Sequence, residues 1–346
     1  MIGDQSGDGG SDSMTPASDP RTHIPEPPDL YEDQLVDATR PLSPFQEELI
    51  LSACPRGSRI VEARFAREDR LPCPVRVHVA SPESAVRQLI LRMDRHIDGV
   101  AIEATLLPVL ARLGLPVPTV LAGPSYDPAR PGLGALSVLS VLPGQDLLSW
   151  AWNAPAADLA TATRLVLDSV ERLHHLTGAL NHDPVADLLP RATVGDELDG
   201  VIARGGPWFD EPVFAQAIEA LRPIVAAIDT PLAFSSGDYN PGNFLWDGEN
   251  VIGFIDFAWA CFEDPHIGFA KYWLYDWFPL NKAGLIERYL ETQRLTQADF
   301  APRLAVRCLW TLQREIPVAD VDGATDYTHY RDRVLGFLRH ALQELG

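Results

Sequence analysis

Three side chains with hard oxygen donors lie close together in the sequence. Asp238 belongs to the segment SGDYNPGNFL at 236–245, Asn243 follows five residues later, and Asp256 follows thirteen residues after Asn243. The Asn-Pro-Gly triplet before Asn243 predicts a turn, so Asp238 and Asn243 are expected in one loop. Asp256 ends the apolar run VIGFID, which is typical of a short strand.

A hairpin would bring these three side chains together. Two short apolar pieces flank Asp247-Gly248, a pair that is typical of a tight turn. The second strand of such a hairpin would return Asp256 to the loop, where two carboxylates and one amide oxygen would converge. Oxygen ligands of this kind suit Mg²⁺, which takes one or two carboxylates together with phosphates and waters. Phosphoryl transfer requires such a cation on the phosphate oxygens and a base near the attacking hydroxyl.

The elements before this stretch form a β-rich pattern. Short runs with alternating apolar or β-branched residues predict strands, and one stretch has helical apolar spacing. The strands are expected at 59–66, 75–80, 88–94, 119–121 and 135–142, and the helix, which contains Pro108, at 101–113. This order favours an antiparallel sheet with one packed helix.

The chain becomes mainly helical after Pro143-Gly144. Apolar periodicity predicts helices at 157–176, 213–228, 283–293, 299–314 and 327–344, with the loop and hairpin at 231–257 between them. The fold class is therefore α+β with two lobes, and a cleft between lobes is a natural ligand site. We expect an acidic disordered tail at 1–40, an N-terminal nucleotide-binding lobe at 41–142 and a C-terminal catalytic and substrate-binding lobe at 143–346.

The motif resembles that of the aminoglycoside phosphotransferase and choline kinase-like superfamily, in which H-G-D-x-x-x-x-N is followed by I-D. The resemblance extends over about residues 50–345, and the aromatic run in EDPHIGFAKYWLYDWF is similar to that of hygromycin-type phosphotransferases. It implies a two-lobed protein-kinase-like fold. It also implies an enzyme that uses Mg²⁺ and transfers the γ-phosphate of ATP or GTP to the hydroxyl of a small molecule.

The resemblance assigns roles residue by residue. It implies Asp238 as the catalytic base, Asn243 and Asp256 as Mg²⁺ ligands, and Arg92 with Glu103 as a charge clamp on the nucleotide phosphates. Backbone groups near Ser140 and Leu142, in the hinge-like stretch SVLSVLPGQ, would hold the nucleobase. His174, in the family's Leu-His pair, would support the catalytic loop. The residues suggested for the acceptor pocket are Tyr239, Trp273, Asp276 and Trp277, with Asp276 facing a cationic group.

Three departures from the family pattern motivate an alternative. Ser236 stands where the family has His, Gly268 stands where it has Asp, and no glycine occurs between Gly57 and Gly99 to form a phosphate-binding loop. The alternative is a catalytically inactive pseudokinase that binds a nucleotide or another ligand. The retention of Asp238 with both metal-ligand candidates favours an enzyme.

Composition sets further expectations. The 346 residues carry a formal net charge of −20, which repels nucleic acid and attracts cations, so a cationic or polyhydroxylated acceptor is expected. The four cysteines form no C-x-x-C pair, and no secretory signal or membrane-spanning run is visible. We therefore expect a soluble cytoplasmic protein. The sequence leaves open the acceptor, the choice between ATP and GTP, and the oligomeric state.

Overall fold

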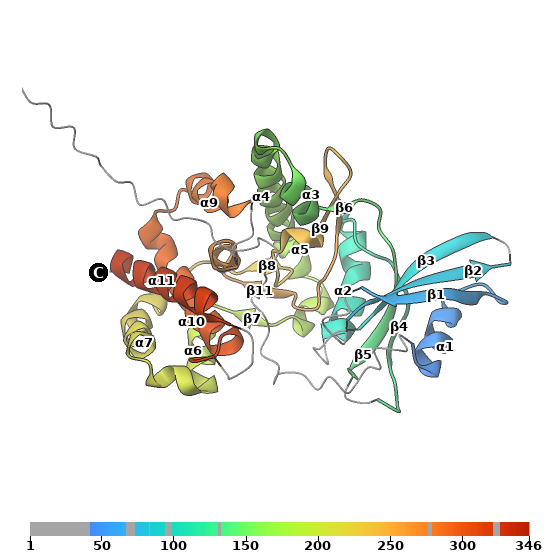
Figure 1. Ribbon diagram of the computed structural model, residues 1–346, viewed down its shortest axis with the longest axis horizontal. Helices are drawn as coiled ribbons and strands as arrows, with labels where there is room; N and C mark the ends of the chain where they lie inside the picture. The colour runs from blue at the N-terminus through green and yellow to red at the C-terminus, as the bar shows by residue number, and fades with distance from the viewer. Residues whose placement is uncertain are drawn as a thin grey trace, which may run out of the picture.

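The computed structural model describes residues 42–66, 73–82, 84–93, 99–130, 133–275, 279–320 and 326–345. The acidic tail expected at 1–40 lies outside them. The chain forms a smaller β-rich lobe and a larger, mainly helical lobe, as expected (Figure 1). None of the described helices is long and apolar enough to span a membrane.

A five-stranded antiparallel sheet forms the N-terminal lobe, with strand order β1-β2-β3-β5-β4. The strands are β1 (Arg59–Phe65), β2 (Val75–Ser81), β3 (Ser84–Arg92), β4 (Val120–Tyr126) and β5 (Ala135–Ser140). Alternation places Val75, Val77 and Val79 on one buried face. The predicted order of strands and helix along the chain and the antiparallel sheet are confirmed.

Two helices cover opposite faces of this sheet. Leu136 and Val138 of β5 belong to the apolar cluster that includes α1 (Pro44–Ser52), whereas Leu139 belongs to the cluster that includes α2 (Gly99–Arg112). Adjacent strand residues point to opposite faces, so the two helices lie on either side. Helix α2 was predicted, whereas α1 was not. Helix α2 shares its apolar cluster with the C-terminal lobe and so connects the two lobes.

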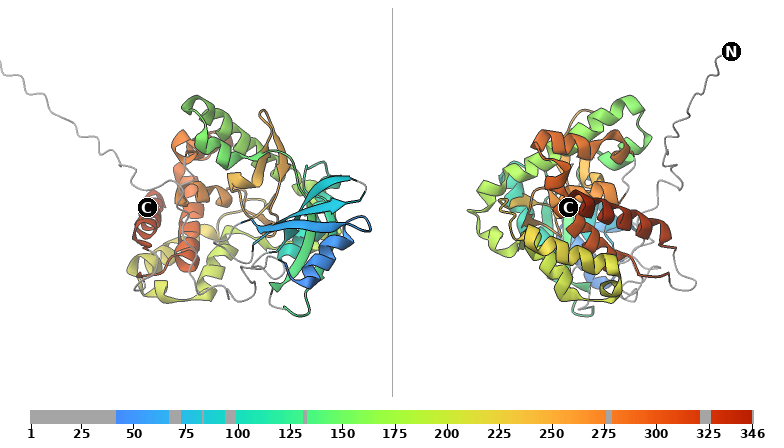
Figure 2. Two further views of the ribbon diagram at one scale, coloured as in Figure 1. Left: turned by 45° about the vertical axis from the view of Figure 1, so that its right-hand side comes forward. Right: turned by 90° about the vertical axis from the view of Figure 1, so that its left-hand side faces the viewer.

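The C-terminal lobe contains α10 (Gln297–Glu315), of which every residue from Phe300 to Leu309 is buried. Figure 2 shows this mainly helical lobe beside the β-rich lobe. All five predicted helices of this lobe are present, and four further helices, α3, α5, α6 and α8, are additional. The other helices are α3 (Leu147–Asn153), α4 (Leu159–His175), α5 (Thr177–Leu180), α6 (Val194–Arg204), α7 (Pro212–Val225), α8 (Lys271–Leu274), α9 (Leu285–Gln293) and α11 (Thr328–Leu345).

Two small sheets hold the predicted loop between them. The expected hairpin is formed by β9 (Phe244–Trp246) and β10 (Val251–Phe254), and β6 (Gln145–Asp146) pairs with β9. The other sheet has the order β7-β11-β8, with β7 at Arg191–Ala192, β8 at Ala233–Ser235 and β11 at Cys261–Glu263. The loop that carries Asp238 thus leaves one sheet and enters the other.

Candidate active site

The Asp238 loop begins with a sharp turn that only glycine fits. Gly237 has φ +78°, and a Cβ there would lie 2.0 Å from the carbonyl oxygen of Trp259. The buried Ser236 hydroxyl donates to the Asp238 carbonyl at 3.0 Å. Ser236, which replaces the family's histidine, therefore stabilises the loop from inside.

The structure brings Asp238, Asn243 and Asp256 together. The Asn243 amide nitrogen donates to the Asp238 carbonyl at 3.3 Å. The Ile255 N–H donates to the Asn243 carbonyl at 3.0 Å, which aligns the end of the hairpin with the loop. Asp256 itself has φ +65°, a left-handed conformation that is unusual outside glycine and frequent at functional sites.

Arg92 and Glu103 connect both lobes to Asp256. The Arg92 Nε donates to Glu103 Oε2 at 2.7 Å, and its Nη2 donates to Asp256 Oδ1 at 2.5 Å. Glu103 Oε1 accepts the N–H of Phe257 at 2.9 Å. Arg92 and Glu103 are only 7% and 2% exposed and so are shielded from water, whereas the Asp256 side chain is 37% exposed. These bonds fix the relative positions of strand β3, helix α2 and the end of the hairpin.

The oxygen donors fit a magnesium ion that is shared with a nucleotide. Asp256 supplies a carboxylate, and Asn243, whose backbone carbonyl accepts the N–H of the neighbouring Ile255 at 3.0 Å, carries an amide oxygen. No group of three or more His, Cys, Asp or Glu among the described residues could hold a metal by itself. Mg²⁺ commonly takes one or two protein ligands and completes its shell with phosphates and waters, so the donor set is suitable.

The hinge residues have different surroundings. The Ser140 N–H donates to the Thr119 carbonyl at 2.9 Å, and its hydroxyl accepts the Thr119 N–H at 2.8 Å. The N–H and hydroxyl of Ser140 are therefore used within the sheet. Leu142 follows the end of β5, is half-buried, and lies next to Gly253 of the hairpin. Of the two residues suggested for the nucleobase, Leu142 is the better placed.

Lys271 is a site residue that the sequence analysis missed. Its Nζ lies 3.2 Å from Asp238 Oδ1 and 3.1 Å from the Gly237 carbonyl. Its side chain is only 12% exposed, so the ion pair is largely shielded. Lys282 is the only other lysine in the chain. The rarity of lysine in this chain, together with the position of Lys271 in the segment EDPHIGFAKYWLYDWF, was the signal that could have identified this residue.

Tyr239 supports the loop and does not face an acceptor. It is 1% exposed, and its hydroxyl lies 2.9 Å from His174 Nε2. Burial raises the pKa of Tyr239 and lowers the pKa of His174 to about 4, so both are neutral near pH 7. The expected role of His174 in supporting the loop agrees with this contact, whereas the acceptor contact expected of Tyr239 does not.

Gly268 is explained by the same tyrosine. A Cβ at Gly268 would lie 2.5 Å from Tyr239 Cε2, so the family's aspartate cannot fit beside this ring without rearrangement. Helix α8 supplies polar anchors instead, since Tyr272 donates its hydroxyl to the Tyr239 carbonyl at 2.7 Å and Lys271 holds the preceding residues. The hydrogen bonds of Tyr272 and Lys271 thus replace the polar anchor that an aspartate at position 268 would supply.

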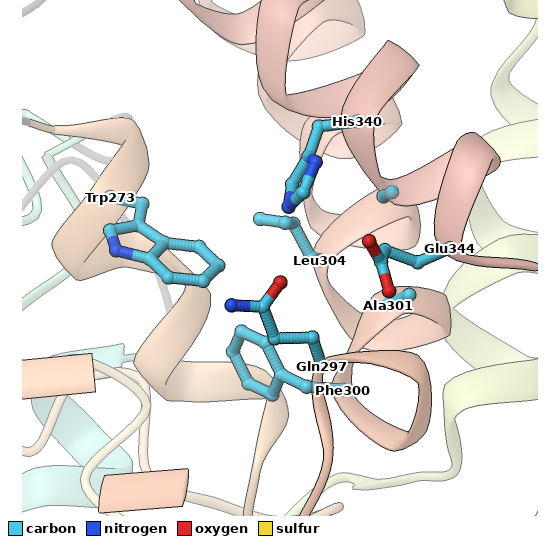
Figure 3. Close-up of a pocket in the computed structure, with 8 residues that line it drawn as sticks. Trp273, Gln297, Phe300, Ala301, Leu304, His340 and Glu344 are labelled. Carbon is cyan, nitrogen blue, oxygen red and sulfur yellow. The ribbon is translucent and has the colours of Figure 1, made fainter. Parts of the chain in front are cut away.

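Trp273 lies on the other side of α8 from this loop, at a hollow between α8, α10 and α11. Figure 3 shows it facing Phe300, Leu304 and His340 across the hollow. Its ring packs edge-on to Phe300 and stacks on Phe337 at 5.6 Å. These contacts belong to helix packing, so the acceptor role expected of Trp273 is not supported. Asp276 and Trp277 lie outside the described residues.

Comparisons with known proteins agree with this fold. A family model described as "Phosphotransferase enzyme family" matches residues 75–304. No curated protein matches in sequence.

Solved structures are similar in fold. A thermostable mutant of aminoglycoside phosphotransferase APH(4)-Ia, in ternary complex with ADP and hygromycin B, has a TM-score of 0.58 at 13% identity, covering 82% of this chain and 94% of that one. The GDP and kanamycin complex of APH(2")-IIia has a TM-score of 0.53 at 13% identity, covering 86% of this chain and 96% of that one. LicA in complex with AMP has a TM-score of 0.52 at 13% identity, covering 87% of this chain and 96% of that one. The chain belongs to the phosphotransferase enzyme family.

Proposed function

We propose that this chain is a small-molecule kinase that transfers the γ-phosphate of ATP or GTP to a hydroxyl group of a small polar acceptor. The observation that carries the proposal is the convergence of Asp238, Asn243 and Asp256 at one loop and hairpin, connected to both lobes through Arg92. Membership of the phosphotransferase family supports it. Structures of similar fold contain hygromycin B or kanamycin, so aminoglycosides belong among the first acceptors to test.

Asp238 is the catalytic base in this proposal. Its side chain is 30% exposed, so a hydroxyl can reach the carboxylate, and Lys271 fixes its position. The carboxylate accepts the proton of the acceptor hydroxyl while the oxygen forms a bond to the γ-phosphorus. The bond from that phosphorus to the β–γ bridging oxygen breaks, and the nucleoside diphosphate leaves with the electron pair.

The remaining residues position the nucleotide. Asn243 and Asp256 would hold Mg²⁺, which neutralises charge on the phosphate oxygens. Arg92 can turn from Asp256 toward a phosphate while Glu103 keeps its Nε in place. Backbone groups at Leu142, just beyond the sheet, are the proposed contact for the nucleobase.

The test is consumption of ATP and of GTP with Mg²⁺ across aminoglycosides, choline-like amines, sugars, hydroxy acids and sugar phosphates. We expect nucleotide consumption with at least one acceptor, and ³¹P NMR of the product should show a phosphate monoester on a hydroxyl. Tight MgADP binding without a phosphorylated product in any reaction would favour the pseudokinase instead.

A further inference from the structure

Helix α10 carries a buried arginine, Arg307, that has no hydrogen-bond or ion-pair partner among the described residues. Arg307 is 7% exposed, and its Nε is buried without a hydrogen bond. Its guanidinium carbon lies 4.9 Å from the ring centroid of Trp310. Among the residues that the structure describes, no carboxylate lies within ion-pairing distance of Arg307.

A second arginine lies against the same tryptophan. The guanidinium carbon of Arg314 is 4.8 Å from the Trp310 centroid, and its Nε is also buried without a partner. Burial, followed by the positive charge of Arg204, lowers the pKa of Arg314, while Glu197 and Glu315 oppose this. Cations are therefore concentrated at this point of a strongly acidic protein.

Arginine remains charged in proteins, so it cannot relieve its burial by losing a proton. A buried charge without an opposite charge or hydrogen bonds is strongly unfavourable. An oxyanion placed against the forked donors of the guanidinium would remove that cost, because carboxylates and phosphates accept two parallel hydrogen bonds.

Glu263 connects this arginine to the catalytic loop. Helix α10 packs against Ile267–Ala270, which run directly into Lys271. Lys271 in turn is bonded to Asp238. Strand β11, which carries Glu263, pairs with β8, from which the Asp238 loop leaves. Burial raises the pKa of Glu263, and the positive charge of Arg307, a hydrogen bond from Ser235 and the charge of Lys271 oppose this. Among the described residues Arg307 forms no ion pair with Glu263, so its guanidinium donors remain available to a ligand.

We propose that the acceptor alcohol carries an oxyanion, a carboxylate or phosphate, and that Arg307 binds this group with the help of Arg314 while the hydroxyl lies at Asp238. This inference rests on the proposed kinase function and names its substrate class. The net charge suggested a cationic acceptor instead. That charge is a property of the whole chain, whereas the donors of Arg307 and Arg314 that lack hydrogen bonds are a property of one place in the fold.

The first test uses binding and needs no turnover. The full-length protein is melted with saturating MgADP, which fills the nucleotide-phosphate region, and with increasing inorganic phosphate or glycerate. We expect a saturable rise in melting temperature for the wild type that is lost in Arg307→Met and kept in Arg164→Met, a control at an exposed arginine on α4. An equal rise in Arg307→Met would overturn the anion site.

The same variant also tests whether Arg307 has a hidden structural partner. Without ligand, Arg307→Met should lower the melting temperature far less than Arg303→Met, because every nitrogen of the Arg303 guanidinium is bonded to the protein, whereas Arg307 makes no hydrogen bond or ion pair among the described residues. A large drop in melting temperature would mean that Arg307 is held by the protein itself, and the inference would be wrong.

The second test uses matched acceptor pairs that differ only in the anion: glycerate or glycerol phosphate against glycerol, gluconate against sorbitol, and pantothenate against panthenol. We expect ATP consumption to favour the charged member, and Arg307→Met to lower its kcat/KM by about 10- to 100-fold, as for a lost hydrogen bond to a charged group. A preference for uncharged or cationic acceptors, abolished by Asp238→Ala, would overturn the inference and leave the kinase intact. Anion binding that depends on Arg307, with no product in any reaction, would support the anion site and overturn the proposed kinase function.

Discussion

Two arginines on α10, one helical turn apart, are buried to the same extent but have opposite surroundings. Arg303 is 6% exposed and makes paired contacts with Asp264 at 2.8–3.1 Å, with further bonds to Thr230 and the Asp299 carbonyl. Arg307 is 7% exposed and makes none of these bonds among the described residues. Because the two side chains are equally buried, they differ in whether protein acceptors satisfy the donors of their guanidinium groups.

This difference separates structural charges from functional ones. At Arg303 every part of the guanidinium has a protein acceptor, which makes the residue part of the fold. Two other cations still have hydrogen-bond donors to spare: Lys271, beside Asp238, has two partners, and Arg307 lies over an indole ring and makes no hydrogen bond among the described residues. Substitutions in the first region should change stability, and those in the second should change ligand binding or turnover.

The largest effect on stability is expected for Arg303→Met. It leaves the Asp264 carboxylate buried at 1% exposure without its cation, so unfolding in urea should require about 3–5 kcal/mol less free energy. Arg307→Met, at equal burial, is the matched comparison and should lose much less, because Arg307 makes no ion pair or hydrogen bond among the described residues. Equal losses in the two variants would remove the distinction between the two arginines.

The next effect concerns pH and the His174–Tyr239 contact. The pKa of His174 is lowered to about 4 from 6.5 by burial and then by the charge of His266, so the unfolded chain binds its proton more readily. Stability is therefore lost as pH falls from about 6.5 to about 4, by roughly 3 kcal/mol from this group. His174→Gln, which keeps a hydrogen-bonding side chain, should flatten this part of the urea-midpoint profile. An unchanged slope in the variant would show that other groups cause the loss.

Lys271→Met should have a smaller effect, on activity more than on stability. Without the ammonium, Asp238 and the Gly237 carbonyl lose a shared donor, so kcat should fall about 10- to 100-fold with little change in nucleotide binding, in line with bonds to charged groups. Partial rescue by Lys271→Arg is expected. Loss of folding without a kinetic change would place Lys271 with Arg303.

The smallest effect is expected for Gly268→Ala. The added methyl would meet the ring of Tyr239, which is packed by Phe269 and held by His174, so it must displace a buried side chain. We expect a loss of about 1–3 kcal/mol in unfolding free energy, as for other overpacked cores. Gly178→Ala, where no atom lies within 4 Å of the added carbon, is the control and should be nearly neutral.

Local patterns predicted much of the fold. Alternation in β2, the turn at Asp247-Gly248 and the periodicity of α10 and α11 are local signals, and the expected strands, hairpin and helices were confirmed. Helix α1 was missed although Ser43 and Gln46 form a capping box, because the run that follows is short and follows a tail-like composition. Helices α3 and α6 were missed for a similar reason, since both are short.

Side-chain direction was harder to predict at the site. The spacing of Asp238, Asn243 and Asp256 anticipated their convergence, because the turn and hairpin that join them are local. Nothing local indicates that Tyr239 points inward to His174 or that Trp273 points to Phe337, since both directions are set by helices distant in sequence. The same holds for Lys271 and Arg307, whose importance depends on which neighbours they have in space.

The most direct measurement is the rate of nucleotide consumption by Asp238→Asn beside the wild type, with the acceptor that the wild type uses best. We predict a fall in kcat of about 10²–10⁴-fold, as for loss of a positioned base, while the melting temperature and MgADP affinity stay unchanged. A variant that folds, binds MgADP and still phosphorylates the acceptor at the wild-type rate would contradict the account, because the reaction would then not depend on the Asp238 carboxylate.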